Sequence, residues 1–170
     1  ILYNATRVRE MIGAGSFAKL LLRVAGFPDI VRVSGGELLE ELDQCYSSFG
    51  MDETMVICRS NKRANRFNEG IRARILYRED AFSSGDKVII VKNNYFWGAE
   101  YDKVDFIANG DIATVEKVGK YKDLYGFHFV NTRLSIYGYE EEITAWVMLD
   151  TLTTEQPALS YEDYRRLYMA

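Results

Sequence analysis

Hydrophobic residues recur at helical spacing in the first part of the chain, where they alternate with short apolar runs. The apolar positions of residues 2–12 and 17–24 each predict a helix. The runs at residues 29–33 (DIVRV) and 54–58 (TMVIC) are short and rich in β-branched residues, so each predicts a strand. Residues 1–58 therefore contain signals for both helices and strands.

Helix-start signals follow both predicted strands. Ser34 and Glu37 have the spacing of a capping box, which predicts a leucine-rich helix that ends before Gly50. Ser60 predicts a second capped helix that begins at the next residue. An alternation of strand, helix, strand and helix is typical of an α/β layer with a parallel sheet.

Beyond residue 82 the pattern changes to short apolar runs separated by turn residues. Asn93-Asn94 and Asn109-Gly110 are turn signals, and the second is typical of a β-hairpin. The sequence predicts strands at residues 87–92, 111–118, 126–136 and 143–149. Short strands at this density are typical of a small barrel or meander.

The expected fold class is α/β plus all-β. The α/β part occupies residues 1–82, an inserted β-barrel occupies residues 83–152, and residues 153–170 return to the α/β part with a helix that Ser160 starts. The chain begins with ILYNATRVREMI, which has neither an initiator Met nor the apolar core of a signal peptide. We expect it to be part of a longer protein.

The composition is that of an ordinary folded domain, with 48% hydrophobic and 27% charged residues. No apolar run approaches the roughly 20 residues of a membrane span, so no membrane partner is expected. Cys45, Cys58 and His128 are too few for a structural zinc site and favour a reducing, cytoplasmic setting. His128 lies between two phenylalanines and is interpreted as a packing residue. We find no catalytic triad and no metal-ligand pattern.

Positive charge is concentrated in residues 58–78. This stretch has seven Lys or Arg residues and one acid, Glu69, whereas the whole chain has a net charge of −4. The stretch therefore carries +6 and the remainder carries −10. A basic patch on an acidic protein indicates an anionic ligand, and a solvated helix face is the alternative.

The basic stretch has two helical stripes. At about 100° per residue, one apolar face contains Ala64, Phe67, Ile71 and Ile75. A polar stripe beside it contains Asn61, Asn65, Asn68 and Arg72. Amides and a guanidinium suit phosphates, and the free N–H groups at the start of the helix add partial positive charge. The pattern equally allows the asparagines to bind neighbouring loops while the arginines are solvated.

Three segments within residues 55–118 carry a family resemblance. MVICRSNKRANRFNEGIR, GDKVIIVKNNYFW and FIANGDIATVEKV occur in this order. Together they resemble the C-terminal half of superfamily 1 DNA helicases of the RecD/TraA type, the UvrD-like helicase C-terminal region. The resemblance implies a partial second RecA-like domain with an inserted SH3-like barrel.

The resemblance places Arg59, Ser60 and Asn61 in motif IV, and the charge and stripes of the basic stretch add the other candidates. The motif IV and DNA-binding candidates are Arg59, Ser60, Asn61, Lys62, Arg63, Asn65, Asn68 and Arg72. The candidates at the turns of the barrel are Asn93, Asn94, Tyr95, Asn109 and Gly110. Phe96 and Trp97 follow these turns, and together with Tyr95 they are candidates for stacking on bases. The equal alternative is that Phe96 and Trp97 fill the core of the barrel or pack it against a neighbouring domain.

By resemblance, the chain is a fragment of an ATP-dependent DNA helicase (RecD-like, exodeoxyribonuclease V alpha-type). It contributes tracking of the single-stranded DNA backbone and part of the motor cleft. No GxxxxGK[ST] motif occurs, so no cofactor is expected on the chain itself, and Mg-ATP belongs to the intact enzyme. The expected partners are single-stranded DNA, bound weakly, and the rest of the helicase chain.

The alternative is a non-enzymatic SH3-like adaptor that binds a protein or peptide through its aromatic turns. An adaptor has no need of the unfinished α/β part, which argues against this interpretation. The two functions differ in whether a nucleotide-binding loop precedes the chain in its gene.

Overall fold

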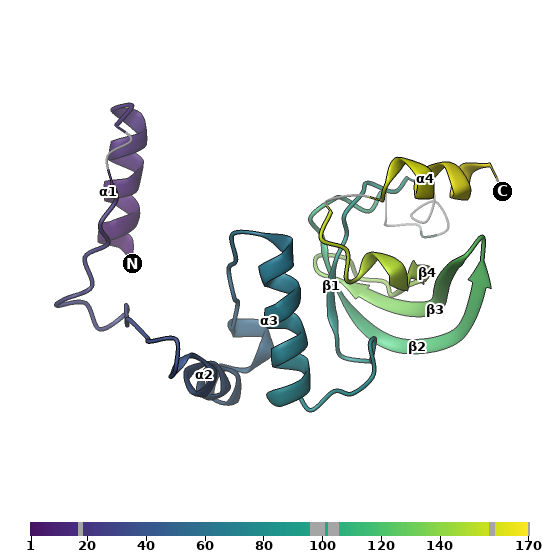
Figure 1. The fold of residues 1–170 in the computed structure, drawn as a ribbon, viewed down its shortest axis with the longest axis horizontal. Helices are drawn as coiled ribbons and strands as arrows, with labels where there is room; N and C mark the ends of the chain where they lie inside the picture. The colour runs from purple at the N-terminus through teal and green to yellow at the C-terminus, as the bar shows by residue number, and fades with distance from the viewer. Residues whose placement is uncertain (17–18, 96–100, 102–105, 157–158, 170) are drawn as a thin grey trace. The chain divides into compact units, whose positions relative to one another are not determined.

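The computed structural model describes residues 1–16, 19–95, 101, 106–156 and 159–169 (Figure 1). The chain divides into two compact units, Ile1–Met55 and Val56–Ala170.

The first unit contains two helices, α1 (Leu2–Gly13) and α2 (Leu38–Glu53). The side chain of Asn4, which is buried, binds the backbone of Arg23 twice. Its amide nitrogen donates to the carbonyl oxygen at 2.8 Å and its oxygen accepts from the backbone N–H at 2.9 Å. This polar clamp holds the segment after α1 against the helix, and α1 itself confirms the helix predicted at residues 2–12.

Two other predictions for this unit are wrong. Residues 19–24 form no helix and residues 29–33 form no strand. The Asn4 side chain forms hydrogen bonds with the backbone N–H and carbonyl of Arg23, which a helix would have used for its own hydrogen bonds. A turn with positive φ at Gly26 (82°) ends the segment. The run at residues 29–33 has no paired strand beside it, so its backbone cannot form a ladder.

Helix α2 begins and ends differently from the prediction. Its N-cap is Glu37, and Ser34 lies in the turn before it, where its hydroxyl donates to the Glu37 carboxylate at 2.6 Å. Ser34 therefore orders the approach to the helix and does not cap it. Gly50 has φ 79° and ψ 176°, which are non-helical values, yet a further turn follows as far as Glu53. At Gly50, where the sequence predicts the end of the helix, the helix is instead kinked.

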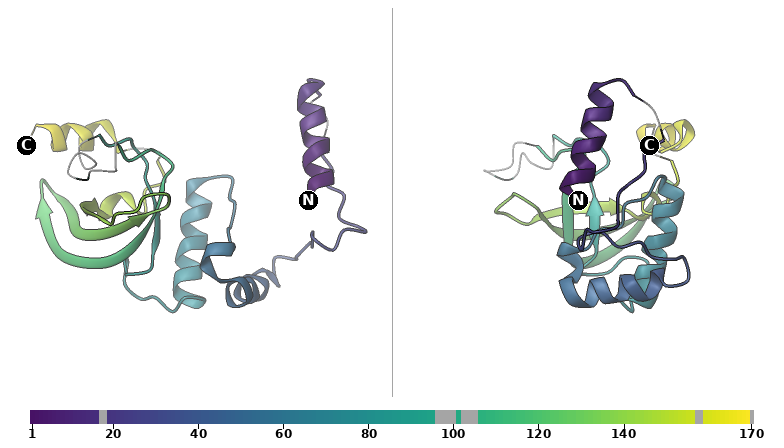
Figure 2. Two further views of the ribbon diagram at one scale, coloured as in Figure 1. Left: turned by 180° about the vertical axis from the view of Figure 1, so that it is seen from behind. Right: turned by 90° about the vertical axis from the view of Figure 1, so that its left-hand side faces the viewer.

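The second unit contains a helix, a four-stranded sheet and a C-terminal helix. The elements are α3 (Asn61–Arg74), β1 (Lys87–Ile89), β2 (Ile112–Leu124), β3 (Phe127–Ile136), β4 (Ile143–Met148), the short 3-10 helix η2 (Leu149–Thr151) and α4 (Tyr161–Tyr168). The strand order is β1-β2-β3-β4, and every neighbouring pair is antiparallel. β2 and β3 form a long ribbon that curls strongly, as Figure 1 and the left view of Figure 2 show.

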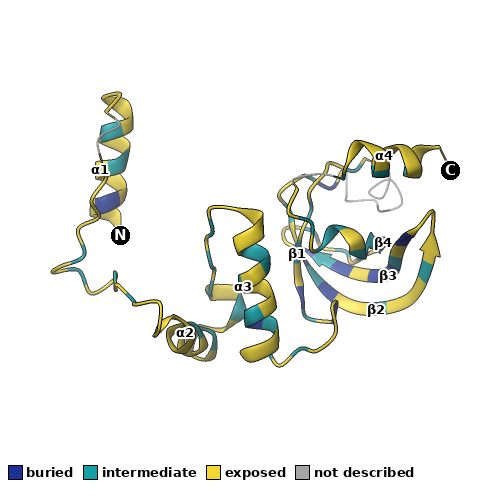
Figure 3. Ribbon diagram, viewed as in Figure 1, coloured by how far each residue is buried: buried dark blue, intermediate teal, exposed yellow. Residues whose placement is uncertain are grey.

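The core of this unit follows the alternation of β3. Val130, Thr132, Leu134 and Ile136 are buried, and the residues between them are more exposed (Figure 3). Phe82 and Ile107, from outside the named strands, complete the cluster together with residues of β2 and β4. A curled antiparallel sheet with one apolar face confirms the all-β part of the prediction at the level of a half-barrel. The SH3-like assignment stays a prediction.

The predicted strand at residues 54–58 does not form. Met55 and Ile57 are 76% and 88% exposed. A parallel strand needs a paired neighbour and cover on both faces, and the described residues supply neither. The observed sheet is therefore wholly antiparallel where the chain is described, and the RecA-like assignment stays a prediction.

A two-residue turn connects β2 and β3. Leu124 pairs with Phe127, and between them Tyr125 and Gly126 both have positive φ, at 57° and 77°. Positive φ at both central positions is the type I′ arrangement, whose twist matches that of the flanking strands.

Among the described residues, no helix has the length and hydropathy needed to cross a bilayer.

Candidate functional site

Helix α3 starts where the sequence predicts. Ser60 has extended backbone angles (φ −148°, ψ 152°), and its hydroxyl accepts from the backbone N–H of Arg63 at 3.4 Å. Ile71 is buried, and Ala64, Phe67 and Ile75 are half-buried, which confirms the predicted apolar face. The last turn contains Arg72 and Arg74, whose charges complement the negative end of the helix dipole.

The predicted polar stripe divides into two kinds of position. Asn61 and Asn68 are exposed. Asn65 is half-buried, and its side-chain amide donates to the carbonyl oxygens of Thr153 at 2.9 Å and Thr154 at 3.3 Å. Asn65 thus binds the loop that follows η2, as the alternative interpretation of the stripe expects.

Arg72 is also engaged within the protein. It forms an ion pair with Asp86 and donates to the backbone carbonyl of Asp80. Arg78 pairs with the same carboxylate, and Asp86 accepts a further hydrogen bond from the N–H of Ser83 at 2.8 Å. The Asp86 side chain is only 8% exposed. Arg72 is therefore part of a buried ion cluster that fixes α3 to the start of β1.

The remaining cations of the stretch are mostly free of acidic partners. Lys62 pairs with Glu155 at 3.0 Å, and both side chains are more than half exposed. Four exposed arginines have no ion pair within the described part of the chain, and we call them the basic edge: Arg59, Arg63, Arg66 and Arg74. The three that belong to α3 fall within about 80° of arc at 100° per residue. They present fixed positive charge on one side of the helix.

The predicted turn residues of the barrel come together in one cluster. The side-chain oxygen of Asn93 accepts from the N–H of Asn109 at 2.8 Å, and Asn94 forms an isolated bridge with Ile107. Gly110 has φ 100° in a tight turn that the N–H of Asp111 closes on Ala108. The turn forms, but it does not join two directly paired strands, because the residue before it is bridged to Asn94. The sequence offered no signal for these cross-loop contacts.

Aromatic rings flank this cluster. Tyr95 is 61% exposed and stacks on Phe106, with ring centroids 5.5 Å apart. The hydroxyl of Tyr139 donates to the backbone carbonyl of Phe106 at 2.9 Å. Phe96 and Trp97, the other stacking candidates, lie outside the described residues.

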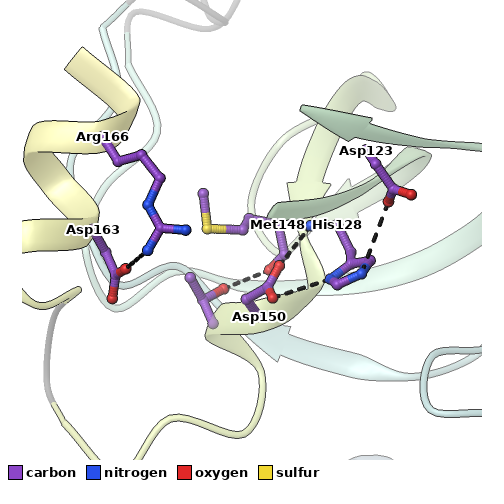
Figure 4. Close-up of polar contacts among 7 residues, drawn as sticks. Asp123, His128, Met148, Asp150, Asp163 and Arg166 are labelled. Carbon is purple, nitrogen blue, oxygen red and sulfur yellow. Dashed lines mark hydrogen bonds and ion pairs between the residues drawn. The ribbon is translucent and has the colours of Figure 1, made fainter. Parts of the chain in front are cut away.

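His128 is placed differently from its interpretation as a packing residue. Its side chain is 65% exposed and lies 3.2 Å from Asp150 through Nδ1 and 3.9 Å from Asp123 through Nε2 (Figure 4). The hydrogen bond and charge of Asp150, with a further contribution from Asp123, raise the pKa of His128 above its ordinary value. The His128 backbone N–H donates to Asp150 at 2.7 Å, which together with the imidazole lowers the pKa of Asp150.

Helix α4 lies beside the end of the β2–β3 ribbon. The guanidinium of Arg166 lies 4.8 Å from the centre of the Phe127 ring. It also pairs with Asp163 at 2.6 Å (Figure 4). A shallow depression of about 340 Å³ lies here, lined among others by Phe127, Asp150, Ser160 and Arg166. Across the described ranges, no group of three or more His, Cys, Asp or Glu residues has the geometry of a metal site.

Comparison of the chain with protein-family models, with curated proteins and with solved structures finds no match.

Proposed function

We propose that the chain is part of an ATP-dependent DNA helicase of the RecD type and that α3 holds the backbone of single-stranded DNA. The observation that supports this most directly is the basic edge. Its four arginines are exposed and lack acidic partners among the described residues, although the chain as a whole has a net charge of −4. Keeping such charges unpaired favours binding of an external anion.

A motor that moves along a strand needs contacts that ignore base identity. Arginine contacts to phosphate have this property because phosphates carry no sequence information. Helix α3 is also fixed in place, since Arg72 binds Asp86 and Asn65 binds Thr153. Arginines on a fixed helix lose less conformational freedom when they bind than arginines on a loose segment.

The rest of the motor function is part of the same proposal. Mg-ATP is bound by other parts of the parent enzyme, which also complete the RecA-like domain. The curled antiparallel sheet that follows α3 agrees with an SH3-like insertion at this point of the chain. The acidic remainder weakens DNA binding at long range, so the contact is strongest at low salt.

A second candidate function is a peptide-binding adaptor. The stacked pair of Tyr95 and Phe106 favours it, because the two rings are 61% and 40% exposed beside the Asn93 turn. Exposed aromatic rings of this kind suit a proline-rich peptide in the polyproline conformation. This function uses the barrel alone and needs no basic edge.

The deciding experiment is fluorescence anisotropy of labelled oligo-dT at several salt concentrations. Arg63→Ala/Arg66→Ala removes two charges of the basic edge and should weaken binding about equally for all sequences. The slope of log K against log salt should flatten by about 1.4, because each phosphate contact on a single strand contributes about 0.7. The control is Arg7→Ala/Arg9→Ala, which removes the same charge from exposed positions of α1.

If the two double variants lose the same affinity for oligo-dT, the loss is due to net charge alone, and α3 is not the contact. Binding of a proline-rich peptide, with no DNA binding at about 20 mM salt, would select the adaptor. Circular dichroism of each variant checks that it is folded.

A further inference from the structure

The face of the sheet opposite to the core has a composition of its own. Side chains at paired positions of neighbouring strands point to the same face. The core side contains Val130, Thr132 and Leu134 of β3, so the alternate residues point outward. With their partners on β2 and β4 they form what we call the outer face: Lys117, Lys122, Phe129, Asn131, Arg133, Thr144, Trp146 and Met148.

The outer face is accessible and positively charged. Lys117, Arg133 and Thr144 are exposed, and the other members are half-buried. Arg133 pairs with Glu142 at 2.7 Å. Lys117 and Lys122 have no acidic partner in the described part of the chain. Two unneutralised lysines on one side of a protein of net charge −4 are complementary to an anion.

An indole lies against one of these charges. The ammonium of Lys122 lies 3.7 Å from the centre of the Trp146 ring, so the half-buried indole presents a flat side to a cation. Trp146 pairs with Asn131 on β3, whose amide is also half-buried. An aromatic ring, an amide and ammonium groups are the set that binds bases by stacking and phosphates by charge.

A bulge in β2 brings the backbone of Gly119 close to Asn131, the partner of Trp146. The register shifts between Val118 and Tyr121, so Gly119 lies at the bulge opposite Asn131. A Cβ atom at Gly119 would lie 2.9 Å from the carbonyl oxygen of Asn131, so the position admits no side chain without a shift of backbone. At this position of β2 the outer face therefore has the Asn131 side chain next to it and no side chain of its own.

We propose that the outer face is a second binding site, specific for single-stranded nucleic acid. One base stacks on Trp146, the ammonium of Lys122 moves from the ring to a phosphate, and Lys117 binds the next phosphate. An acidic peptide would use the lysines but would have no use for the indole, so nucleic acid explains more of the face. The site lies on the sheet and is independent of the basic edge on α3.

The test uses Trp146 as a reporter. The chain has two tryptophans, so Trp97→Phe leaves Trp146 as the only one. Oligo-dT and oligo-U of equal length, added at about 20 mM salt, should both quench its fluorescence, because every base has a flat face for stacking. Quenching by either supports the shared chemistry, and this measurement requires no change to the outer face itself.

A second measurement removes the charges. In the Trp97→Phe background, Lys117→Ala/Lys122→Ala should weaken the affinity read from quenching about tenfold and flatten its salt slope by about 1.4. Arg7→Ala/Arg9→Ala, with the same loss of charge, should change it less than twofold. Arg63→Ala/Arg66→Ala should leave quenching in place, which separates this site from the contact proposed for α3.

Three results would overturn the proposal. One is anisotropy that shows DNA binding while Trp146 fluorescence stays unchanged. Another is equal quenching by polyglutamate, which would make the face a site for acidic peptides. The third is loss of quenching in Arg63→Ala/Arg66→Ala with no effect of Lys117→Ala/Lys122→Ala, which would assign the signal to α3.

Discussion

Arg72 on α3 and Asp86 at the start of β1 form an ion pair that joins the helix to the sheet. Arg78 contacts the same carboxylate, so one buried acid holds two arginines. The pair explains why Arg72, which has the spacing of a DNA-facing residue in the sequence, is turned towards the protein. The same contact makes Asp86, like Thr153, a residue that holds α3 in position.

Asp86→Ala should destabilise the second unit by about 3 kcal/mol, because it leaves two partly buried guanidinium groups without their partner. Arg72→Ala should cost less, since Arg78 still neutralises the carboxylate. Urea unfolding measures both effects. Glu69→Ala, at an exposed position of α3, is the control and should change stability by no more than about 0.5 kcal/mol. Equal losses for Asp86→Ala and Glu69→Ala would contradict the role of the cluster.

Glu155→Gln should strengthen binding of oligo-dT. The substitution releases Lys62 from its ion pair and adds a free cation beside the basic edge. The pair is exposed and contributes little, so the expected gain is about twofold to fivefold at low salt. Glu162→Gln on α4 changes the net charge equally at an exposed position. Anisotropy titrations that give the same gain for both variants would attribute it to net charge alone.

The titration of His128 should report its contact with Asp150. The contact raises the pKa of His128, so the folded state binds the proton more tightly than the unfolded state does. Its stabilising contribution is therefore complete below the ordinary histidine pKa of about 6.5 and disappears as the pH rises through the higher folded value. His128 is the only histidine, so its ring gives one NMR titration curve. Asp150→Asn should move that curve to lower pH, and an unchanged midpoint would contradict the contact.

Tyr125→Asn should stabilise the β2–β3 turn. Tyr125 has φ 57°, a left-handed conformation in which asparagine costs less than a bulky side chain. The expected gain is about 1 kcal/mol in the free energy of unfolding. Tyr137→Asn is a matched control, because Tyr137 is 91% exposed and lies outside the left-handed region. If chemical denaturation gives the same shift for both variants, the conformation of Tyr125 is not the cause.

The sequence predicts best what short-range physics determines. The Ser60 cap, the apolar face of α3 and the alternation of β3 each depend on residues a few positions apart, and all three are present. The predicted parallel strands at residues 29–33 and 54–58 needed partners far along the chain. An apolar run alone does not show whether such partners exist, so these predictions fail.

The candidate site divides in the same way. Exposure of Arg63 and Arg66 follows from their place on the helix, outside the apolar face. The partners of Asn65 and of His128 lie 88 and 22 residues away, and no local pattern indicates them. The outer face needs the register of three strands before Lys117 and Trp146 can be placed on one surface.

The strand order β1-β2-β3-β4 has a consequence for the folding kinetics of the sheet. Each strand pairs only with its neighbour in sequence, so the contact order of most of the sheet is low. The tight connection between β2 and β3 makes their ribbon the natural nucleus, and β4 adds to it across a short loop. Pairing of β1 must instead close the loop of residues 90–111, at a larger cost in chain entropy. In a pulse-labelling hydrogen-exchange experiment, amides of β3 should become protected first and those of β1 last.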